Sequence, residues 1–478
     1  MLRGFLAALA AASSVAAPHT AADGAFTKMD TNVTMSDGVQ IAVTYFEPTG
    51  ARPAGGWPAV MMFHGLGQTR NSLDLSTWSA NSVAETYLAP AGYAVLTFDA
   101  RAHGESGGLF SLDGPRELQD TRELFAWLVD KHPVDASHVG AFGVSYGGGM
   151  VWLAATSGVP FAAITAAATW TDLHQALIPQ GLLRAGIVLG FATSIPQSHY
   201  APELTTILHI AASEQDTPDV RSFLAERSTR TRLAALQTPT LMLQGRRDFA
   251  FDADQAIAAY RLLKGPKRLY LGDLGHAPAP NPVAEVPHLA LQARAWFDRF
   301  LKGTGATEGS KVELAPNPWN GTTVMYNALP PTRVLRLTGR GTSRLTATGK
   351  VVRNVGRVKH IETFGTPVVT VSISSRAGYR HLAAVLSSVA PGGAETVITD
   401  GGIELPTLSG KSRTVAIRLP DEITPVPAGS KLRLTLAATS TAQSVSNPVY
   451  LLPVADGSTA TIGRVTLTLP VLKRPISP

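Results

Sequence analysis

The pentapeptide Gly143-Val144-Ser145-Tyr146-Gly147 constrains the fold of this chain more than any other segment. An apolar run at 138–142 precedes it and predicts a buried strand, and residues 148–155 predict the start of a helix. A sharp turn between strand and helix strains the central residue, so only very small side chains fit two positions before and after it. The pattern therefore indicates that the Ser145 hydroxyl is held above a sheet edge, where a base and a substrate can reach it.

The length of 478 residues favours two domains, because a single core rarely grows that large. The chain contains no cysteine, which excludes a disulfide framework, a zinc-thiolate site and a cysteine nucleophile. Its sequence has no clustered metal-ligand spacing and no phosphate-binding loop. We therefore expect the chain to use neither a metal nor a cofactor.

The first 16 residues are typical of a secretory signal peptide. Arg3 supplies the basic start, residues 4–12 are apolar, and Ser14-Val15-Ala16 fits the small-x-small cleavage pattern. The apolar part is too short for a spanning helix, and no later segment has about 18 uninterrupted apolar residues. This pattern predicts a secreted or periplasmic protein that is soluble once the leader is removed.

Strand-like and helix-like segments alternate over residues 30–302. Continuous apolar strands separated by helices indicate an α/β domain with a parallel sheet covered on both faces. The expected strands are 40–45, 58–63, 93–98, 138–142, 161–168, 238–243 and 268–271, and the clearest helices are 118–129 and 287–301. The segment 171–236 is longer than a crossover connection requires, and it contains helical stretches. It therefore predicts a cap inserted over the sheet edge at which Ser145 lies.

Residues 303–320 are rich in Gly, Pro, Thr and Asn and predict a linker. Beyond them, residues 321–478 change texture and predict an antiparallel, jelly-roll-like β-sandwich. Period-two alternation of apolar and polar residues is clearest at 369–373, 415–419, 432–436 and 465–469.

Charge is unevenly distributed between the two halves. Residues 331–478 carry 18 Lys and Arg against 7 Asp and Glu, whereas residues 1–330 carry 23 against 28. A basic C-terminal domain could make weak contacts with anionic surfaces. The arginines are scattered along strands without aromatic interleaving, which favours a solvated basic face and excludes a nucleic-acid partner.

A serine hydroxyl needs an adjacent base, usually a histidine oriented by a carboxylate. In this topology the acid and then the histidine follow the serine, each after the end of a strand. Asp248 follows the strand at 238–243, and it is preferred over Asp252, which lies in the first turn of the next helix. His276 follows the last strand in a Gly-flanked loop, and it is preferred over His288, which lies at the closing helix.

The negative oxygen of a tetrahedral intermediate requires preset donors. The backbone N–H of Tyr146, directly after the serine, is one expected donor, and that of Leu66 in the loop 64–68 is the other. We expect His64 to act as a structural hydrogen-bonding group rather than as a catalyst.

With these residues in place, the chain resembles the α/β-hydrolase superfamily. Within it, the chain is similar to the X-prolyl dipeptidyl peptidase and cocaine-esterase-like acyl hydrolases. The resemblance rests on the serine motif, on Asp99–Gly107, which resembles the family segment D-x-R-G-x-G-x-S-x-G with Ala102 in place of a glycine, and on the tail pattern from Gly365 to Gly401. It implies an α/β-hydrolase domain followed by a jelly-roll domain.

The chain also departs from the family, because its cap is small and no tyrosine follows the third strand. These departures favour a serine esterase that acts on a small-molecule or lipid-like ester with an uncharged acyl group. An aminopeptidase releasing X-Pro dipeptides is the alternative, although its buried amine would need a paired carboxylate. A third hypothesis is a non-catalytic protein that binds glycans or the cell envelope.

Overall fold

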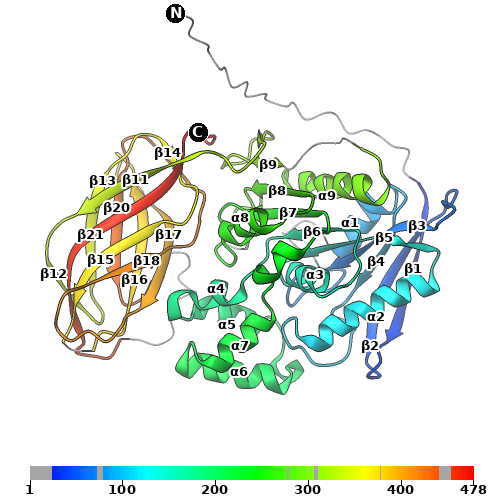
Figure 1. Ribbon diagram of the computed structural model, residues 1–478, viewed down its shortest axis with the longest axis horizontal. Helices are drawn as coiled ribbons and strands as arrows, with labels where there is room; N and C mark the ends of the chain where they lie inside the picture. The colour runs from blue at the N-terminus through cyan, green and yellow to red at the C-terminus, as the bar shows by residue number, and fades with distance from the viewer. Residues whose placement is uncertain (1–23, 73–78, 277–278, 306–310, 377, 441–453) are drawn as a thin grey trace, which may run out of the picture.

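The computed structural model describes residues 24–72, 79–276, 279–305, 311–376, 378–440 and 454–478 (Figure 1). The signal peptide expected at residues 1–16 lies outside these ranges. An α/β part and a β-rich part lie side by side, and the cap helices lie at the edge of the α/β part (Figure 1). Within the described ranges, no helix has the length and apolar character needed to cross a bilayer.

A ten-stranded sheet forms the centre of the α/β part, in the order β1-β2-β4-β3-β5-β6-β7-β8-β9-β10. The seven neighbouring strands β4-β3-β5-β6-β7-β8-β9 are parallel to one another. The pairs at the two edges, β1–β2, β2–β4 and β9–β10, are antiparallel. Its strands are β1 (Phe26–Thr34), β2 (Gln40–Pro48), β3 (Trp57–Phe63), β4 (Ala94–Phe98), β5 (Val134–Val144), β6 (Ala163–Ala167), β7 (Thr240–Gly245), β8 (Lys267–Gly272), β9 (Lys311–Leu314) and β10 (Val324–Tyr326).

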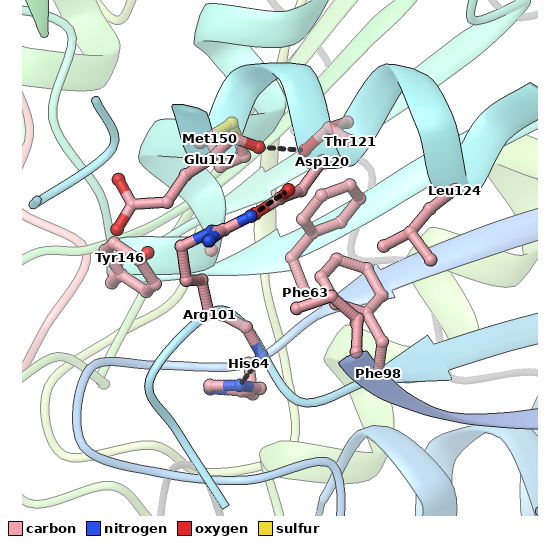
Figure 2. Close-up of a pocket in the computed structure, with 13 residues that line it drawn as sticks. Phe63, His64, Phe98, Arg101, Glu117, Asp120, Thr121, Leu124, Tyr146 and Met150 are labelled. Atoms are coloured by element: carbon pink, nitrogen blue, oxygen red, sulfur yellow. Dashed lines mark hydrogen bonds and ion pairs between the residues drawn. The ribbon is translucent and has the colours of Figure 1, made fainter. Parts of the chain in front are cut away.

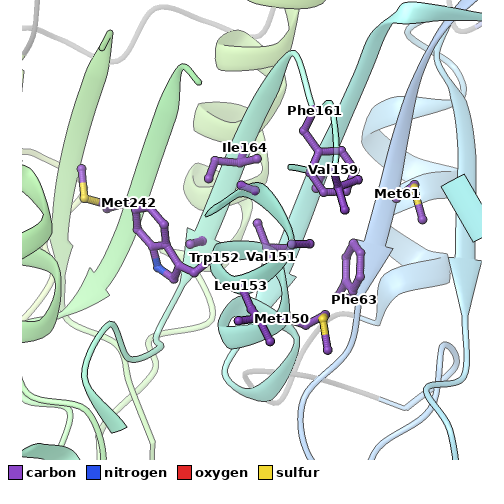
Figure 3. Close-up of a cluster of buried hydrophobic side chains, with 14 of the residues drawn as sticks. Met61, Phe63, Met150, Val151, Trp152, Leu153, Val159, Phe161, Ile164 and Met242 are labelled. Atoms are coloured by element: carbon purple, nitrogen blue, oxygen red, sulfur yellow. The ribbon is translucent and has the colours of Figure 1, made fainter. Parts of the chain in front are cut away.

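Helices cover both faces of this sheet, so its central strands are apolar throughout. On β3, Met61 and Phe63 join one core cluster while Val60 and Met62 join the other. The first face is covered by α2 (Pro115–Lys131), α3 (Tyr146–Thr156) and α8 (Ala253–Leu262), and the second by α1 (Ala80–Val83), the π-helix η1 (Ala84–Leu88) and α9 (Val286–Leu301). Figure 3 shows the side chains of α3 packed against the strands of the sheet. This packing fixes α3, whose N-cap residue is Ser145.

The prediction of a linker at 303–320 is wrong in part. Residues 311–314 form β9, which extends the parallel sheet beside β8. Residues 324–326, expected in the β-sandwich, form β10 and pair with β9. Val312 and Leu314 are fully buried, and this burial stabilises the strand. Two alternating apolar residues between Gly- and Pro-rich stretches are too short a signal to identify a strand from sequence.

The cap lies between β6 and β7, where the insertion was expected. Its helices are α4 (Leu173–Leu177), α5 (Ala185–Thr193), α6 (Pro202–Glu214) and α7 (Pro218–Glu226), with short 3-10 turns η2 (Pro179–Gly181), η3 (Gln197–His199) and η4 (Arg230–Ala235). Gln180 ties the cap to the second domain, since its Nε2 donates to the carbonyls of Gly402 and Arg418, each at 2.9 Å. The amide of Arg418 donates in return to Oε1 of Gln180 at 3.0 Å.

The C-terminal part consists of antiparallel sheets that enclose one apolar core. On β15, Val369, Val371 and Ile373 are fully buried and alternate with less buried neighbours, as the period-two pattern predicts. One sheet contains β11 (Thr332–Gly339), β12 (Ser343–Thr346), β15 (Val368–Ser374), β18 (Arg413–Arg418) and β21 (Thr459–Leu472); a second contains β13 (Lys350–Arg357), β16 (His381–Val389), β17 (Glu395–Glu404) and β20 (Lys431–Ala437); β14 (Ile361–Glu362) pairs with β19 (Pro425–Val426). The fold class expected from the sequence, an α/β domain with a helical cap followed by an antiparallel β-rich domain, is confirmed, and the jelly-roll arrangement of the second domain stays a prediction.

A group of buried and half-buried carboxyls lies where the two domains meet. Asp252, at the start of α8, accepts a hydrogen bond from the amide of Asp421 at 2.8 Å. Burial raises the pKa of Asp421 to about 8, and the charge of Asp252 adds to the shift. Burial and the neighbouring Asp254 likewise raise the pKa of Asp252 to about 6. Both carboxyls therefore keep their protons in the folded protein at pH values where the unfolded chain has lost them.

This arrangement gives the protein a stability that decreases as pH rises from about 4 to about 8, because the unfolded chain then releases protons that the folded chain retains. We expect Asp421→Asn to raise the melting temperature by several degrees at pH 8.5 and to raise it much less at pH 5. Thermal unfolding measured across this pH range tests the expectation. The matched control is Asp456→Asn, which removes the same charge from an exposed position. Equal pH dependence in Asp421→Asn and the unaltered protein would contradict the assignment.

Candidate active site

Ser145 occupies a strained turn between β5 and α3. Its backbone has φ 54° and ψ −116°, a region that non-glycine residues rarely adopt. A Cβ added at Gly143 would lie 2.2 Å from the carbonyl oxygen of Gly147, and one added at Gly147 would lie 2.4 Å from that of Phe63. The two flanking glycines are therefore required by the close approach of the backbone around the serine.

Three side chains from separate segments meet at this turn. The hydroxyl of Ser145 lies 2.8 Å from Nε2 of His276. Nδ1 of the same ring lies 3.0 and 2.9 Å from the two carboxylate oxygens of Asp248. An ionised carboxylate can only accept, so Nδ1 carries the proton and Nε2 is left to accept the proton of the serine. The structure thus brings together the three residues that the sequence singled out.

The loops after β7 and β8 hold the acid and the histidine. Asp248 is fully buried, and its Oδ1 also accepts from the amides of Ala250 at 3.0 Å and Phe251 at 3.1 Å. Gly275 has φ 143°, and a Cβ there would lie 2.7 Å from the Cβ of Asp248. The two loops are therefore in close contact, which leaves the imidazole little freedom to turn away from the carboxylate.

The two alternative residues lie elsewhere. Asp252 bonds to the C-terminal domain, as described above, rather than to the histidine. Nε2 of His288 lies 3.1 Å from Oε1 of Glu313, and its ring is between those of Tyr270 and Trp319.

The loop after β3 lies against the beginning of α3. The amide of Gly147 donates to the carbonyl of His64 at 3.1 Å, which joins the loop containing Leu66 to the turn containing Tyr146. The amide of Ala100 donates to Nε2 of His64 at 2.9 Å, so Nδ1 carries the proton that it donates to the carbonyl of Gly65. Burial lowers the pKa of His64 to about 4, which keeps the ring neutral. His64 is thus a structural residue of this loop, and the role of the Leu66 and Tyr146 amides as oxyanion donors remains a prediction.

A small cavity of about 20 Å³ lies behind the turn, large enough for one water molecule (Figure 2). Glu117 and Tyr146 line it together, and burial, with the nearby Glu117, raises the pKa of the Tyr146 phenol well above its usual value. Arg101 faces the same cavity and donates two hydrogen bonds of 2.7 Å to Asp120 of α2. The ring of Tyr146, the residue whose amide we expect to stabilise the oxyanion, packs against those of His103 at 5.5 Å and Phe110 at 5.6 Å.

The segment 99–107 supports the site rather than forming it. Asp99 accepts hydrogen bonds from the amides of Arg70 at 2.8 Å and Glu105 at 2.9 Å. Ala102, which replaces a glycine of the family pattern, has φ 64°. A glycine is favoured there because this backbone region is strained for residues with a Cβ.

Aromatic side chains cover the histidine from the cap side. The ring of Phe251 lies 5.2 Å from that of His276, and Trp170 and Phe191 contact Phe251 at 5.0 and 5.9 Å. Phe191 belongs to α5, so this aromatic series runs from the cap to the histidine. The structure thus gives the site an apolar cover.

The sequence reasoning missed two groups of residues around the acid. Phe251 lies three residues after Asp248, but an aromatic residue in a loop carries no distinct signal. Arg246 and Glu362 form a fully buried ion pair near the acid, across the two domains. The only sequence hint was the Arg246-Arg247 doublet at the end of an apolar strand, and nothing marked Glu362 as its partner.

Comparison with known proteins decides the family. The model of the family described as X-Pro dipeptidyl-peptidase (S15 family) matches residues 37–278. The model of the X-Pro dipeptidyl-peptidase C-terminal non-catalytic domain matches residues 359–462. This chain belongs to the S15 family. The resemblance drawn from the sequence is confirmed, and the protein is an α/β-hydrolase of a serine-hydrolase family.

Two curated relatives match parts of this S15-family chain. A cocaine esterase from Rhodococcus sp. (strain MB1 Bresler) is 28% identical over 336 residues, which cover 59% of this chain and 56% of the relative. The quorum-quenching protein AidA from Acinetobacter baumannii (strain MDR-ZJ06) is 34% identical over 117 residues, covering 24% of this chain and 36% of the relative. The chain therefore spans about half or less of the length of these relatives.

Solved structures share the fold over nearly the whole chain. A CocE/NonD family hydrolase from Staphylococcus aureus aligns with a TM-score of 0.71 at 15% identity, covering 94% of each chain. An α-amino acid ester hydrolase aligns with a TM-score of 0.69 at 14% identity, covering 96% of this chain and 100% of the other. At such identities the similarity shows the common two-part architecture.

The glycines around Ser145 give a direct test of the geometry. We expect Gly143→Ala to displace the turn, because its Cβ would overlap the carbonyl of Gly147. A shift of about 1 Å at the nucleophile costs about 100-fold in reaction rate, and the overlap destabilises the fold by roughly 3 kcal/mol. The rate of Ser145 modification by a fluorophosphonate probe, together with the melting temperature, measures both effects.

The matched control is Gly190→Ala, which places the same methyl group in open space on α5. This variant should react as fast as the unaltered protein and gain up to about 1 kcal/mol of stability from the better helix former. Normal reactivity of Gly143→Ala would show that the turn tolerates a side chain and would contradict the strained geometry.

Proposed function

We propose that the protein is a secreted serine esterase that cleaves carboxylic esters through Ser145, His276 and Asp248. The continuous hydrogen-bond chain from the buried carboxylate through the imidazole to the hydroxyl carries this proposal. Such a chain lets a neutral imidazole remove the serine proton and then stabilises the imidazolium that forms.

The reaction follows from these positions. Nε2 of His276 takes the proton of Ser145 as its Oγ attacks the acyl carbon, and the amides of Tyr146 and Leu66 donate to the resulting oxyanion. Collapse of the intermediate expels the alcohol, which takes the proton from His276 and leaves an acyl-enzyme. Water then attacks the acyl carbon with His276 again as the base, and the carboxylic acid is released. The proton of Ser145 thus leaves with the alcohol, and a proton taken from water by His276 restores the serine hydroxyl as the carboxylic acid is released.

An uncharged acyl group suits the apolar surroundings of the serine. Tyr146, Trp170 and Phe251 belong to one buried apolar cluster with cap residues such as Ile187. A buried ammonium group is stable only beside an ionised partner. The curated relative named a cocaine esterase also supports an ester substrate.

X-Pro dipeptidyl peptidase activity is the second candidate, supported by the family's name and by one carboxyl. Glu422, from the C-terminal domain, is buried close enough to Asp248 and Arg247 to feel their charges. Burial raises the pKa of Glu422 well above its usual value, and a further cation bound beside the carboxyl would favour its ionised form. An α-amino group is the substrate cation that could do this.

One comparison separates the two candidates. We expect a p-nitrophenyl butyrate substrate to be cleaved with a higher kcat/KM than Ala-Pro-p-nitroanilide, because the cover of the site is apolar. Glu422→Gln should change the ester rate little. A faster dipeptide reaction that is lost in Glu422→Gln would establish the peptidase instead.

The triad itself gives the sharpest expectation on activity. Ser145→Ala should abolish turnover, and Asp248→Asn should lower kcat about 10⁴-fold, because an amide no longer favours the reactive imidazole tautomer. Circular dichroism would check that both variants fold. Asp252→Asn is the matched control for the acid, since Asp252 does not contact His276. A larger loss in Asp252→Asn than in Asp248→Asn would contradict the assignment of the acid.

Export rests on the leader pattern at residues 1–16 and remains part of the proposal. We expect the full-length chain, expressed in a secreting bacterial host, to leave the cytoplasm with a new N-terminus after Ala16. Intact-mass measurement of the exported protein identifies that terminus. A cytoplasmic protein that retains Met1 would contradict it.

A further inference from the structure

The C-terminal domain contacts the loop that contains Asp248 directly. Arg246, two residues before the acid, donates its amide to the carbonyl of Gly272 at 2.8 Å and accepts at its own carbonyl from the amide of Ile423 at 2.7 Å. Gly272 ends β8, the strand that leads to His276. The backbone of Arg246 therefore connects the acid loop, the strand before the histidine and the C-terminal domain.

The side chain of Arg246 makes a larger set of contacts. Its guanidinium is fully buried and forms an ion pair with the equally buried carboxylate of Glu362. It also donates to the carbonyls of Ala315 and Ile423 and to the hydroxyl of Ser477. The planar, always-charged guanidinium suits such a multiply bonded position, since its donors point in fixed directions.

Hydrogen bonds from the C-terminal segment of the chain hold the carboxylate of Glu362. Oε2 accepts from the amides of Ile476 at 2.6 Å and Ser477 at 3.1 Å, and Oε1 accepts from the Ser477 hydroxyl at 2.6 Å. Burial alone would raise the pKa of Glu362, but the charge of Arg246 and these hydrogen bonds hold it below its usual value. The carboxylate is therefore ionised, and the buried pair has one preferred geometry.

We propose that Arg246 and Glu362 are positioning residues through which the C-terminal domain holds Asp248 in register with His276. The inference rests on the proposed function, in that it takes Asp248 as the acid of the triad. A buried charge without its partner is strongly unfavourable, so the acid loop can keep its conformation only while the C-terminal domain is docked. The β-rich domain is then part of the catalytic apparatus without touching the substrate.

The test replaces the carboxylate and follows the reactivity of the serine. In the full chain, we expect Glu362→Gln to slow fluorophosphonate modification of Ser145 by about 10- to 100-fold, because misplacement of the acid by up to about 1 Å costs this much. The same variant should lower kcat for p-nitrophenyl butyrate with little change in KM. Glu395→Gln is the matched control, since Glu395 forms a more exposed ion pair with Arg433 in the same domain. It should react within about twofold of the unaltered protein.

A double-variant measurement separates positioning from a general loss of structure. If Glu362 acts through Asp248, Glu362→Gln should slow the reaction less than about threefold in a chain that already carries Asp248→Asn, since coupled residues are not additive. An equal slowing in both backgrounds would overturn the proposal.

Two further outcomes are informative. Should Glu362→Gln fail to fold, Ser477→Ala replaces it, because this variant removes one hydroxyl from the pair and keeps both charges; a folded Ser477→Ala with an unchanged labelling rate would overturn the proposal. Normal labelling of Asp248→Asn would instead refute the assignment of the acid, and thus the proposed function. Slow labelling of Asp248→Asn with normal labelling of Glu362→Gln would refute only the positioning role.

Discussion

The site depends on the close backbone approach around Ser145. The carbonyl oxygens of Gly147 and Phe63 occupy the space where side chains at Gly143 and Gly147 would lie, and the serine takes a left-handed conformation as a result. This strain of a few kcal/mol is maintained only because α3 is packed firmly on the sheet (Figure 3). In return, the hydroxyl and the first free amide of α3 are presented together at the sheet edge.

The second constraint is the junction of the two domains. It contains a buried arginine–glutamate pair and the carboxyls of Asp252, Asp421 and Glu422, whose pKa values burial raises. Buried ionisable groups are costly to maintain, and replacing them with apolar residues often increases stability. Their presence beside the acid loop is therefore better explained by the geometry they impose than by the stability they add.

Much of this could be predicted from the sequence. The order of serine, acid and histidine, each after an apolar strand, was enough to single out Ser145, Asp248 and His276, which the structure brings into contact, because a parallel sheet brings the ends of its strands to one edge. The β-rich domain was evident from alternation, since its strands have one face on the core. The cap was evident from the excess length between two strands.

The rest lay beyond local patterns. The strands β1, β9 and β10 could not be predicted from the pattern of apolar residues. β1 carries mostly exposed side chains, and β9 and β10 are too short to show a period. The pairing of Arg246 with Glu362 joins residues 116 positions apart through the packing of two domains, which no periodicity reveals. The same is true of Glu422, whose nearness to Asp248 follows from how the domains dock.

The central claim is that Ser145 is an activated nucleophile facing a preset oxyanion site. A crystal structure of the protein after reaction with a p-nitrophenyl phosphonate tests it most directly. We expect phosphorus bonded to Oγ of Ser145, with the phosphoryl oxygen about 2.7–3.1 Å from the amides of Tyr146 and Leu66 and His276 still on Asp248. An unmodified Ser145, or a phosphoryl oxygen turned away from both amides, would contradict it.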